Sequence, residues 1–418
     1  MCGGELCSYG PGSRRFHLDR MLGNASTAGG AGALSLFEAR IARVTHQHET
    51  YIGAPPTRLY PKPGGAAAAS QPGPKRGRLP GSPMSQPGFR APPSPESPQP
   101  AAPLHVGVTP WEMSAEMDAA QLVRQVERAE ALAFDSFWLP EHHFGGAGSV
   151  LAPLLLLAGA ATRTRRLALA TTSLLLPVRH PLHVAAEVAV LDRLSGGRLI
   201  LGLGRGFATS LFRAFQVPPR EKRDRFEEAI RRMRDAWAGR PVCDAEGRPV
   251  ILSPLPLQRP HPPLWVAAFG PKALAQAGRL GLPYLASPIE TLARLEGNYA
   301  TYREQGEAAG VATPPEVPVM RSVFAHPDVT LCARVHEALA RQAATLPRSR
   351  AAAIQREDTP RVEDFALVGE PAAVADSIAH YRERLGLTHL VARVGVPGLP
   401  APVLETALDE LAALRERL

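Results

Sequence analysis

A carboxylate and two imidazoles stand side by side in the stretch "FWLPEHHF", as Glu141, His142 and His143 directly after an apolar run. An imidazole, with a pKa of about 6.5, is the side chain best suited to moving protons at neutral pH. Adjacent residues on an extended segment point to opposite sides, so the two histidines would not easily share one metal ion. The pattern therefore favours proton chemistry over a metal site, and a purely structural strand end is the remaining alternative.

A glycine-rich stretch, "LILGLGRGF" at residues 199–207, carries a single guanidinium, that of Arg205. The dinucleotide motif G-x-G-x-x-G would need a glycine where Phe207 stands, so the stretch does not match it. Glycines such as Gly204 let a planar or phosphorylated ligand approach the backbone, and an arginine can pair with a phosphate through two hydrogen bonds. A ligand site and a tight corner with Arg205 in a salt bridge both remain open.

Two further strand ends carry groups that could bind a ligand. In "WVAAFGPKALAQAG", residues 265–278, a predicted strand breaks at Gly270 and Pro271 and a helix follows at once. Proline suits the first helical turn, and the free N–H groups there attract anions, to which Lys272 adds a positive charge. At residues 171–173, "TTS" places three hydroxyls in an apolar strand, where they would bind the edge of a heterocycle or satisfy a local bulge.

These candidates need elements that bring them together, and after residue 103 short β-type runs alternate with longer helical patterns. The runs typical of strands are residues 104–109, 136–139, 167–176, 199–204, 264–269, 283–287, 317–324 and 389–394. Helices are predicted at residues 119–132 and 225–239, where apolar side chains recur every three or four positions. This alternation indicates an α/β fold, a (β/α)8 TIM barrel with insertions, and a doubly wound open sheet is the competitor. In a barrel the candidate groups would meet at the carboxyl ends of the strands.

The first 103 residues differ in composition from the rest of the chain. Residues 51–103 hold 15 of the 43 prolines and show no apolar periodicity. Such a segment cannot bury enough apolar surface to offset its conformational entropy, so we predict a disordered extension at 1–103 and a folded domain at 104–418. A translation start at Met84 is a hypothesis that follows from this composition, and an intact mass beginning at residue 1 or 2 would exclude it.

Charge and cysteine content limit the partners and the compartment. The net charge is +8, but residues 1–103 hold 11 of the 47 Lys/Arg and only 5 of the 39 Asp/Glu, so the folded part is nearly neutral. This distribution argues against a nucleic-acid partner. The four cysteines form no CxxC pair, and without a convincing secretory signal we expect a reducing, cytoplasmic environment. No apolar run reaches the roughly 20 residues of a membrane span, so no membrane partner is expected.

Taken together, the stretches "FDSFWLPEHHF", "LATTSLLLPVRHPLHVAAEVAVLDRLSGGRLILGLGRGF" and "PPLWVAAFGPKALAQAGRLGLPYLAS" resemble the luciferase-like flavin-dependent monooxygenase family, the superfamily of bacterial luciferase. The resemblance covers residues 104–418. It implies a TIM barrel that binds reduced FMN at its carboxyl-terminal mouth. By matched position it also implies that His142 is the catalytic imidazole, with Glu141 and His143 beside it and no metal.

The resemblance further implies the residues that hold the flavin. They are a cis peptide under the ring at Thr172 and Ser173, Gly204 near the ring, the phosphate-binding Arg205, and the backbone amides of Ala268, Phe269 and Gly270 with Lys272 close by. Bacterial luciferase has a cysteine where this chain has Gly204, and an acid–serine pair at the positions of Ala268 and Phe269. These departures argue against light emission as the activity.

The family implies that reduced FMN reacts with O2 to a C4a-(hydro)peroxyflavin, which oxygenates a small organic substrate such as an aldehyde or ketone. His142 would give or take the proton, and residues 343–364 would act as a lid that excludes water. A separate NAD(P)H:flavin reductase would supply the reduced FMN, with direct use of NAD(P)H as the alternative, and the chain would form a homodimer. Two other functions remain open: an F420-dependent hydride-transfer oxidoreductase of the same superfamily, and a non-catalytic flavin-binding accessory protein.

Overall fold

The computed structural model of the chain describes residues 103–112, 119–144, 149–243, 247–344, 361–415 and 417–418. All of them lie in one compact unit, Pro93–Leu418. The predicted extension up to residue 102 and residues 345–360 of the predicted lid lie outside the described residues.

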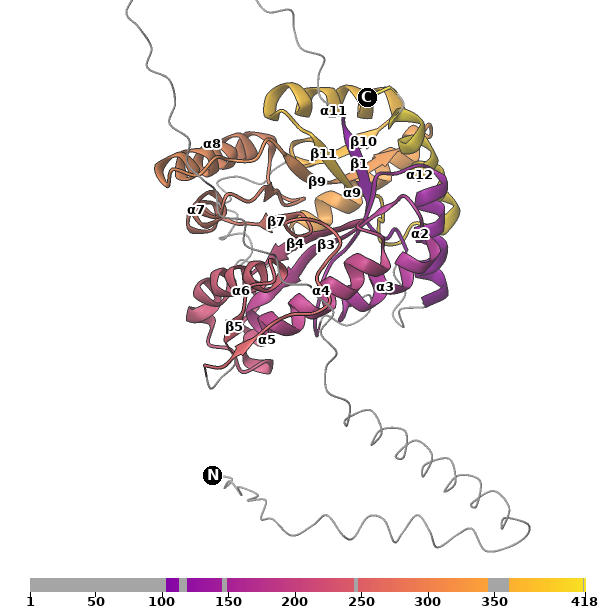
Figure 1. Cartoon of the computed structure of the whole chain (residues 1–418). Coiled ribbons are helices and arrows are strands. Elements are labelled where there is room, and N and C mark those ends of the chain that lie inside the picture. Colours follow the sequence, from indigo (N-terminus) through magenta and orange to yellow (C-terminus); the bar gives the residue numbers. More distant parts are fainter. Residues whose placement is uncertain (1–102, 113–118, 145–148, 244–246, 345–360, 416) are drawn as a thin grey trace, which may run out of the picture. The chain divides into compact units, whose positions relative to one another are not determined.

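Eight parallel strands form the barrel that the sequence predicts, and Figure 1 labels most of them. In chain order, which is also the order around the ring, they are β1 (His105–Val108), β2 (Ser136–Leu139), β3 (Ala168–Leu175), β4 (Leu199–Gly204), β7 (Leu264–Ala267), β8 (Tyr284–Leu285), β9 (Pro318–Ala325) and β11 (His389–Arg393). A parallel bridge between Ala286 and Val319 closes the ring between β8 and β9, and the Ala286 N–H donates to the Pro318 carbonyl at 3.0 Å. The fold is therefore a TIM barrel, and the open-sheet alternative is excluded.

Three short strands were not predicted. β10 (Ala366–Gly369) pairs with the second half of β9, from Ser322 to Ala325. β5 (Val242–Cys243) and β6 (Pro249–Val250) form a two-stranded antiparallel ribbon before β7. These segments have two to four residues each.

Helices follow most strands and cover the outside of the ring (Figure 1). Among the described residues the α-helices are α2 (Ala119–Ala131), α3 (Pro153–Arg163), α4 (Pro181–Leu194), α5 (Thr209–Ala214), α6 (Lys222–Trp237), α7 (Pro271–Leu280), α8 (Leu292–Ala308), α9 (Val329–Ala344), α11 (Pro371–Leu385) and α12 (Ala401–Arg415). Several begin with proline at the first helical position, as in α3, α4, α7 and α11. The main core fills the space between these helices and the strands.

A second, smaller core lies inside the ring. It consists of Trp138, Ala170, Trp265, Leu285, Met320 and Val391, all buried. The rings of Trp138 and Trp265 stack with centroids 5.0 Å apart. Because side chains alternate along a strand, these residues also identify which positions of each strand point inward.

The motif "LDRLSGGR" has a structural role at the amino-terminal end of β4. The buried carboxylate of Asp192 accepts hydrogen bonds from the backbone N–H groups of Leu257 and Gln258, at 2.7 and 2.9 Å. Arg198 donates to the carbonyls of Ser195 and Leu167. The motif thus anchors the long loop before β7 and lies far from the carboxyl ends of the strands.

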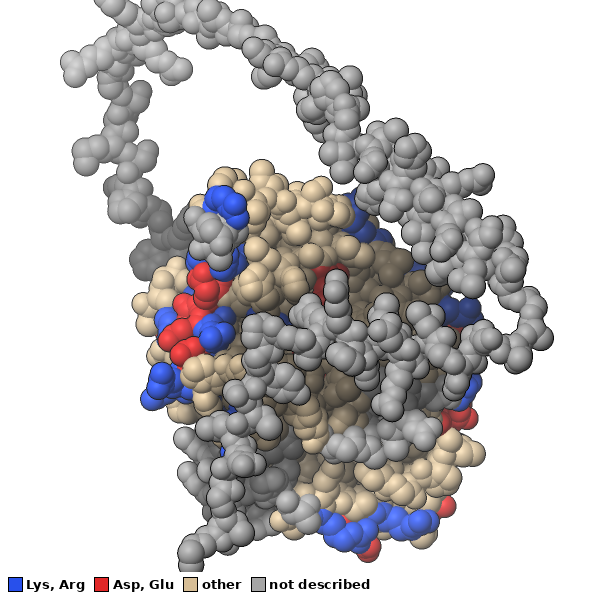
Figure 2. All heavy atoms as spheres, turned by 90° about the horizontal axis from the view of Figure 1, so that it is seen from below, with Lys and Arg blue, Asp and Glu red and all other residues tan. Residues whose placement is uncertain are grey.

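Charges of both signs share the surface that Figure 2 presents, where blue and red side chains lie next to one another between larger tan areas. No single-signed basic face is visible in that view. Among the described residues, no helix is long and apolar enough to cross a membrane.

Candidate functional site

Glu141 follows β2 and joins the carboxyl ends of two strands. Its side chain is fully buried. Oε1 lies 2.6 Å from Nε2 of His143 and accepts from Nη2 of Arg179 at 2.8 Å. Oε2 accepts the backbone N–H of Leu175, the last residue of β3, at 2.8 Å. The carboxylate therefore positions its neighbours, and both of its oxygens are engaged in doing so.

The two histidines have different surroundings. The side chain of His143 is 10% exposed and meets the ring of Phe215 edge-on, with centroids 5.1 Å apart. His142 has an exposed side chain, while its backbone N–H donates to the Val150 carbonyl at 2.9 Å. Alternation along the segment thus gives one anchored imidazole and one solvent-facing imidazole at the carboxyl end of β2.

The carboxyl end of β3 has a bulge and a cis peptide bond between Thr172 and Ser173, where the family resemblance places one. The pairing of β3 with β4 shifts between Thr172 and Leu174, so Ser173 is the extra residue. Two glycines of β4 make room for this bulge. A Cβ on Gly202 would overlap the Thr171 carbonyl oxygen, and a Cβ on Gly204 would overlap the hydroxyl of Ser173.

Arg205 comes directly after β4 and is 8% exposed. Its Nη1 donates to Oε1 of Gln276 on α7, and its Nη2 to the Ala267 carbonyl at the end of β7, both at 3.0 Å. Its guanidinium carbon also lies 5.4 Å from the centre of the Phe226 ring on α6. These three partners are neutral, so none of them balances the charge of Arg205.

Lys222 and Arg223, at the start of α6, add positive charge next to Arg205. Burial, with a smaller contribution from Arg223, lowers the pKa of Arg205 to about 10. Burial, followed by the charges of Arg223 and Arg205, also lowers the pKa of Lys222. Arg205 remains protonated at neutral pH, and the repulsion between these cationic groups marks a place where an anion would be stabilised.

The turn between β7 and α7 lies beside this cluster, because Ala267 accepts from Arg205. Ala268 is buried, Phe269 is 38% exposed, and Gly270 precedes α7 with a positive φ of 75°. Lys272 is exposed in the first turn of α7. The structure therefore brings Arg205 and the turn at residues 268–270 together, which is the arrangement expected of a phosphate-binding site. Lys272 lies at the surface.

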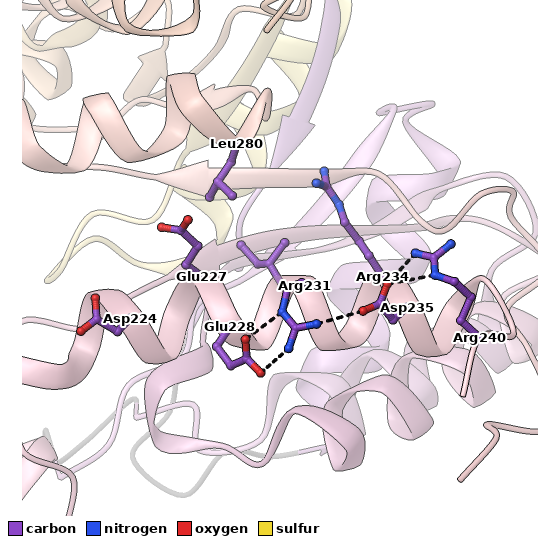
Figure 3. Close-up of a pocket in the computed structure, with 9 residues that line it drawn as sticks. Asp224, Glu227, Glu228, Arg231, Arg234, Asp235, Arg240 and Leu280 are labelled. Carbon is purple, nitrogen blue, oxygen red and sulfur yellow. Dashed lines mark hydrogen bonds and ion pairs between the residues drawn. The ribbon is translucent and has the colours of Figure 1, made fainter. Parts of the chain in front are cut away.

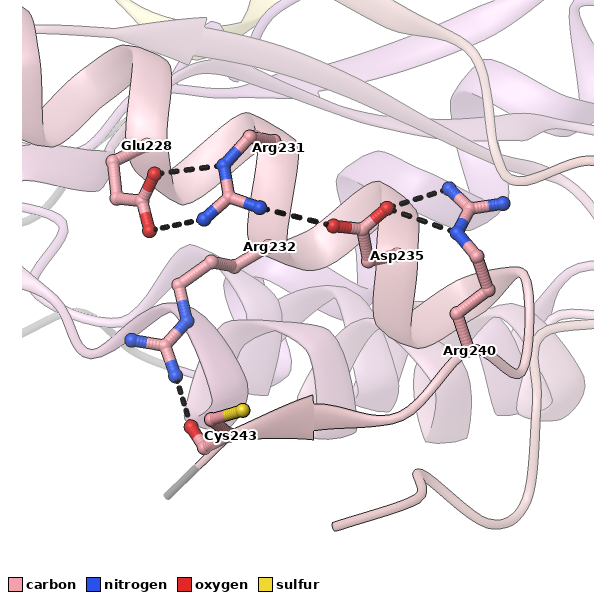
Figure 4. A network of polar contacts seen from close by, with 6 residues as sticks. All are labelled: Glu228, Arg231, Arg232, Asp235, Arg240 and Cys243. Atoms are coloured by element: carbon pink, nitrogen blue, oxygen red, sulfur yellow. Dashed lines mark hydrogen bonds and ion pairs between the residues drawn. The ribbon is translucent and has the colours of Figure 1, made fainter. Parts of the chain in front are cut away.

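A surface hollow on α6 is separate from these strand ends. It is lined by Asp224, Glu227, Glu228, Ile230, Arg231, Arg234, Asp235, Arg240 and Leu280 (Figure 3). Most of its charges are paired along the helix, from Glu228 to Arg231, Asp235 and Arg240 (Figure 4). None of the predicted site residues lines this hollow. Across the described ranges, no group of three or more His, Cys, Asp or Glu residues is arranged to hold a metal ion.

Sequence reasoning did not assign several residues that the structure brings to the site. Arg179 binds Glu141, and Lys222 and Arg223 surround Arg205. Gln276 links Arg205 to Glu227, to which its Nε2 donates at 3.1 Å. Arg179 could have been found from the sequence, since it closely follows a predicted strand. Lys222, Arg223 and Gln276 could not, because their roles depend on contacts between distant segments.

Residues 101–389, more than half of the chain, match the family described as luciferase-like monooxygenase. The chain belongs to the luciferase-like monooxygenase family. Limonene 1,2-monooxygenase of Rhodococcus erythropolis is 37% identical to it over 139 residues, 32% of this chain and 36% of that protein. The alkanal monooxygenase alpha chain of Photorhabdus luminescens is 27% identical over 194 residues, 46% of this chain and 54% of that protein. The chain thus spans roughly a third to a half of the length of these relatives.

Three solved structures share this fold over about three quarters of the chain. Monooxygenase RslO1 from Streptomyces bottropensis has a TM-score of 0.64 and 29% identity, covering 74% of this chain and 98% of that one. The oxygenating constituent of 3,6-diketocamphane monooxygenase from Pseudomonas putida, in complex with FMN, has a TM-score of 0.61 and 20% identity, covering 74% and 96%. An F420-dependent secondary alcohol dehydrogenase reaches 0.60 with 20% identity, covering 75% and 99%. The fold alone therefore does not choose between FMN and F420.

Proposed function

We propose that this member of the luciferase-like family is a monooxygenase that uses reduced FMN and O2 to oxygenate a small organic substrate such as an aldehyde or ketone. The observation that carries the proposal is the buried cation Arg205, which lies beside Lys222 and next to the glycine-rich strand end that accommodates the bulge of β3. Reduced FMN, when bound, would supply the electrons that activate O2.

Arg205 would bind the phosphate of the flavin. A guanidinium offers several donors in a fixed plane, and a phosphate would relieve the repulsion between Arg205, Lys222 and Arg223. The backbone N–H groups at residues 268–270, at the start of α7, would add further donors. Riboflavin, which lacks the phosphate, would gain nothing from these groups.

The flavin ring would pack against the bulge at Ser173 together with Gly202 and Gly204. A glycine presents only backbone, so a planar ring can approach it closely. The bulge changes the direction of β3 at its carboxyl end, and such bulges are common next to active sites.

His142 would exchange a proton with the reacting groups, since it is the solvent-facing imidazole at the end of β2. His143 would act through position, because Glu141 and the ring of Phe215 hold it in place. Glu141 lies opposite Arg179 and would fix the orientation of the segment that carries both histidines.

The test is a titration of the purified chain with FMN, reduced FMN, riboflavin and F420, followed by oxygen uptake with a panel of aldehydes and ketones. Tight FMN binding, with oxygen uptake that depends on an organic substrate, supports the proposal. Saturable binding of F420 with no oxygen uptake would favour the hydride-transfer alternative. Flavin binding with His142→Ala and His143→Ala both indistinguishable from the wild type would indicate an accessory protein.

A separate reductase would supply the reduced FMN. One relative, 29% identical over 189 residues, is named the oxygenase component of a flavin-dependent trigonelline monooxygenase from Acinetobacter baylyi, and the match covers 43% of this chain and 52% of that protein. Oxygen uptake should therefore require an added NAD(P)H:flavin reductase. Equal uptake with NAD(P)H and FMN alone would show that the chain reduces its own flavin.

We also propose a homodimer that uses the outer face of α3 and α4, which pack against each other. Leu155 on α3 and Val190 on α4 are 74% and 58% exposed, and a partner subunit would cover both apolar side chains. Sedimentation of the full chain should give a dimer, and Leu155→Glu should shift it toward monomer. A wild-type monomer at all concentrations would contradict this.

A further inference from the structure

Exposed phenylalanines gather at the carboxyl-terminal side of the barrel. Among the described residues, the exposed ones are Phe144, Phe207, Phe215 and Phe269, and every other phenylalanine is buried. Each of the four lies in a connection that leaves the carboxyl end of β2, β4 or β7. Exposed apolar side chains that gather on one face, unlike scattered ones, indicate a binding site.

Two of these phenylalanines are in contact with each other and with His143. The ring of Phe215 meets the ring of His143 edge-on, with centroids 5.1 Å apart. The ring of Phe144 lies 5.8 Å from that of His143 and 5.9 Å from that of Phe215. Phe144 is 65% exposed and Phe215 is 39% exposed, whereas the side chain of His143 is mostly buried. These three residues form the aromatic cluster, which presents two phenyl rings to solvent.

The backbone holds Phe144 in its exposed position at an energetic cost. Its φ is 59°, in the left-handed region that a bulky side chain rarely adopts. Because most of the ring is exposed, packing within the chain offsets little of that cost. Strained residues of this kind are concentrated at active sites and ligand-binding sites, so the position of the Phe144 ring points to a ligand.

The aromatic cluster adjoins the proposed flavin site on two sides. On one side, Nε2 of His143 lies 2.6 Å from Oε1 of the buried Glu141, in the segment that carries both histidines. On the other side, Phe215 directly follows α5, and the ring of Phe212 in that helix lies 5.6 Å from Nζ of Lys222. The cluster therefore lies between the proton-active segment and the cations proposed to bind the flavin phosphate.

We propose that the aromatic cluster binds an aromatic ring of the substrate, so that the substrate is an aromatic aldehyde or ketone. This inference rests on the proposed function. Phenyl rings attract a further aromatic ring edge-on or offset, because the negative face of one ring meets the positive edge of another. A saturated ring of the same size would be buried equally well but would not gain this attraction. A protein partner would have to cover a far larger surface than two phenyl rings, so a small molecule fits the cluster better.

The experiment compares two ketones that share one carbon skeleton. The full chain, in the presence of saturating FMN, is titrated by calorimetry with acetophenone and with cyclohexyl methyl ketone, which differ only in whether the ring is aromatic. The wild type should bind acetophenone about 2- to 10-fold more tightly, the range expected of one aromatic contact. Phe144→Leu and Phe215→Leu keep an apolar side chain, and each should reduce that preference. The double variant should abolish it.

Phe144→Gly distinguishes ligand binding from packing. Glycine adopts a positive φ without strain, so this variant should keep or raise the melting temperature while the preference for acetophenone falls. A marked fall in the melting temperature would show that the ring stabilises the fold, and it would overturn the inference.

Ile251→Ala is the matched control, because Ile251 is 66% exposed and lies in the connection to the amino-terminal end of β7. It should keep the full preference for acetophenone. Equal affinity of the wild type for both ketones, or no saturable binding of either, would overturn the inference. A preference that survives in the double variant would also overturn it, and a weaker response of that variant to an added flavin reductase would then place a protein partner on the cluster. A failure of the wild type to bind FMN would instead remove the proposed function.

Discussion

Oε1 of Glu141 lies 2.6 Å from Nε2 of His143, and the same oxygen accepts from Arg179 at 2.8 Å. One buried carboxylate therefore connects the loop after β2 with the segment after β3. Its second oxygen accepts the N–H of Leu175, so backbone and side chains of both strand ends converge on it. The proton-active segment is rigid at Glu141 and His143 and open to solvent at His142.

Replacing Glu141 by glutamine should lower the free energy of unfolding by about 3 kcal/mol, because Arg179 would lose its charged partner in a mostly buried position. Glu337→Gln is the control, since the ion pair of Glu337 with Arg341 also joins a carboxylate and a guanidinium but is exposed, and its loss should cost less than about 1 kcal/mol. Urea denaturation of both variants measures the difference. Losses of equal size would mean that burial of the Glu141 pair has no energetic consequence.

Substitutions of His142 and His143 should have different effects on turnover and stability. His142→Ala should lower turnover by about 100-fold or more, the contribution typical of a general acid or base, with little change in thermal stability. His143→Ala should lower both turnover and stability, because it removes a partner of Glu141 and the contact with Phe215. Steady-state rates and melting temperatures give the comparison, with the exposed His336→Ala as control. A fully active His142→Ala would remove this residue from proton transfer.

Arg205→Gln should weaken FMN binding by about 10-fold or more and riboflavin binding by less than about twofold, since only FMN carries the phosphate. Arg198→Gln provides a control on the opposite end of β4, where Arg198 holds the carbonyls of Ser195 and Leu167. That variant should lose stability without distinguishing the two flavins. Fluorescence titrations of both ligands are the measurement, and equal losses for FMN and riboflavin in Arg205→Gln would place the phosphate elsewhere.

Gly204→Ala should destabilise the protein by about 1–3 kcal/mol and weaken flavin binding, because the added methyl group overlaps the Ser173 hydroxyl. Gly159→Ala is the matched control. Gly159 lies within α3 and a Cβ there meets nothing within 4 Å, so alanine should stabilise the helix by about 0.5–1 kcal/mol. Chemical denaturation tests both. If the two variants had the same stability, the close contact of β3 with β4 would not be a constraint.

In mild acid, the free energy of unfolding should depend on the protonation of His389. Burial, with a smaller contribution from His105, lowers the pKa of His389 to about 4, whereas in the unfolded chain it is about 6.5. The unfolded chain therefore binds a proton that the folded chain rejects, and the free energy of unfolding falls as the pH drops from about 6.5 to about 4, with no effect above that window. His389→Phe keeps a ring against Trp265 and cannot titrate. Its loss of stability between pH 7 and pH 4.5 should be smaller than that of the wild type by about 2 kcal/mol. Identical pH profiles would contradict the assignment.

Local patterns were sufficient for most of the fold. The strand predicted at residues 199–204 has the same bounds as β4, and the other seven barrel strands fall within or next to their predicted ranges. Alternation of strands and helices is a local property, which explains this success. The strands β5, β6 and β10 were not predicted, and each of them is held by pairing with a partner strand.

The sequence by itself determined the alternation of strands and helices and which polar groups stand at the strand ends, because these depend on neighbours a few residues apart. Only the tertiary structure decided how those groups combine. Glu141 meets Arg179 across 38 residues, and Arg205 meets Gln276 across 71. It also decided that Arg321 is buried against helix α11, since the inward side of each strand is defined only once Ala286 and Val319 close the ring. Such contacts arise from ring closure, which no local pattern encodes.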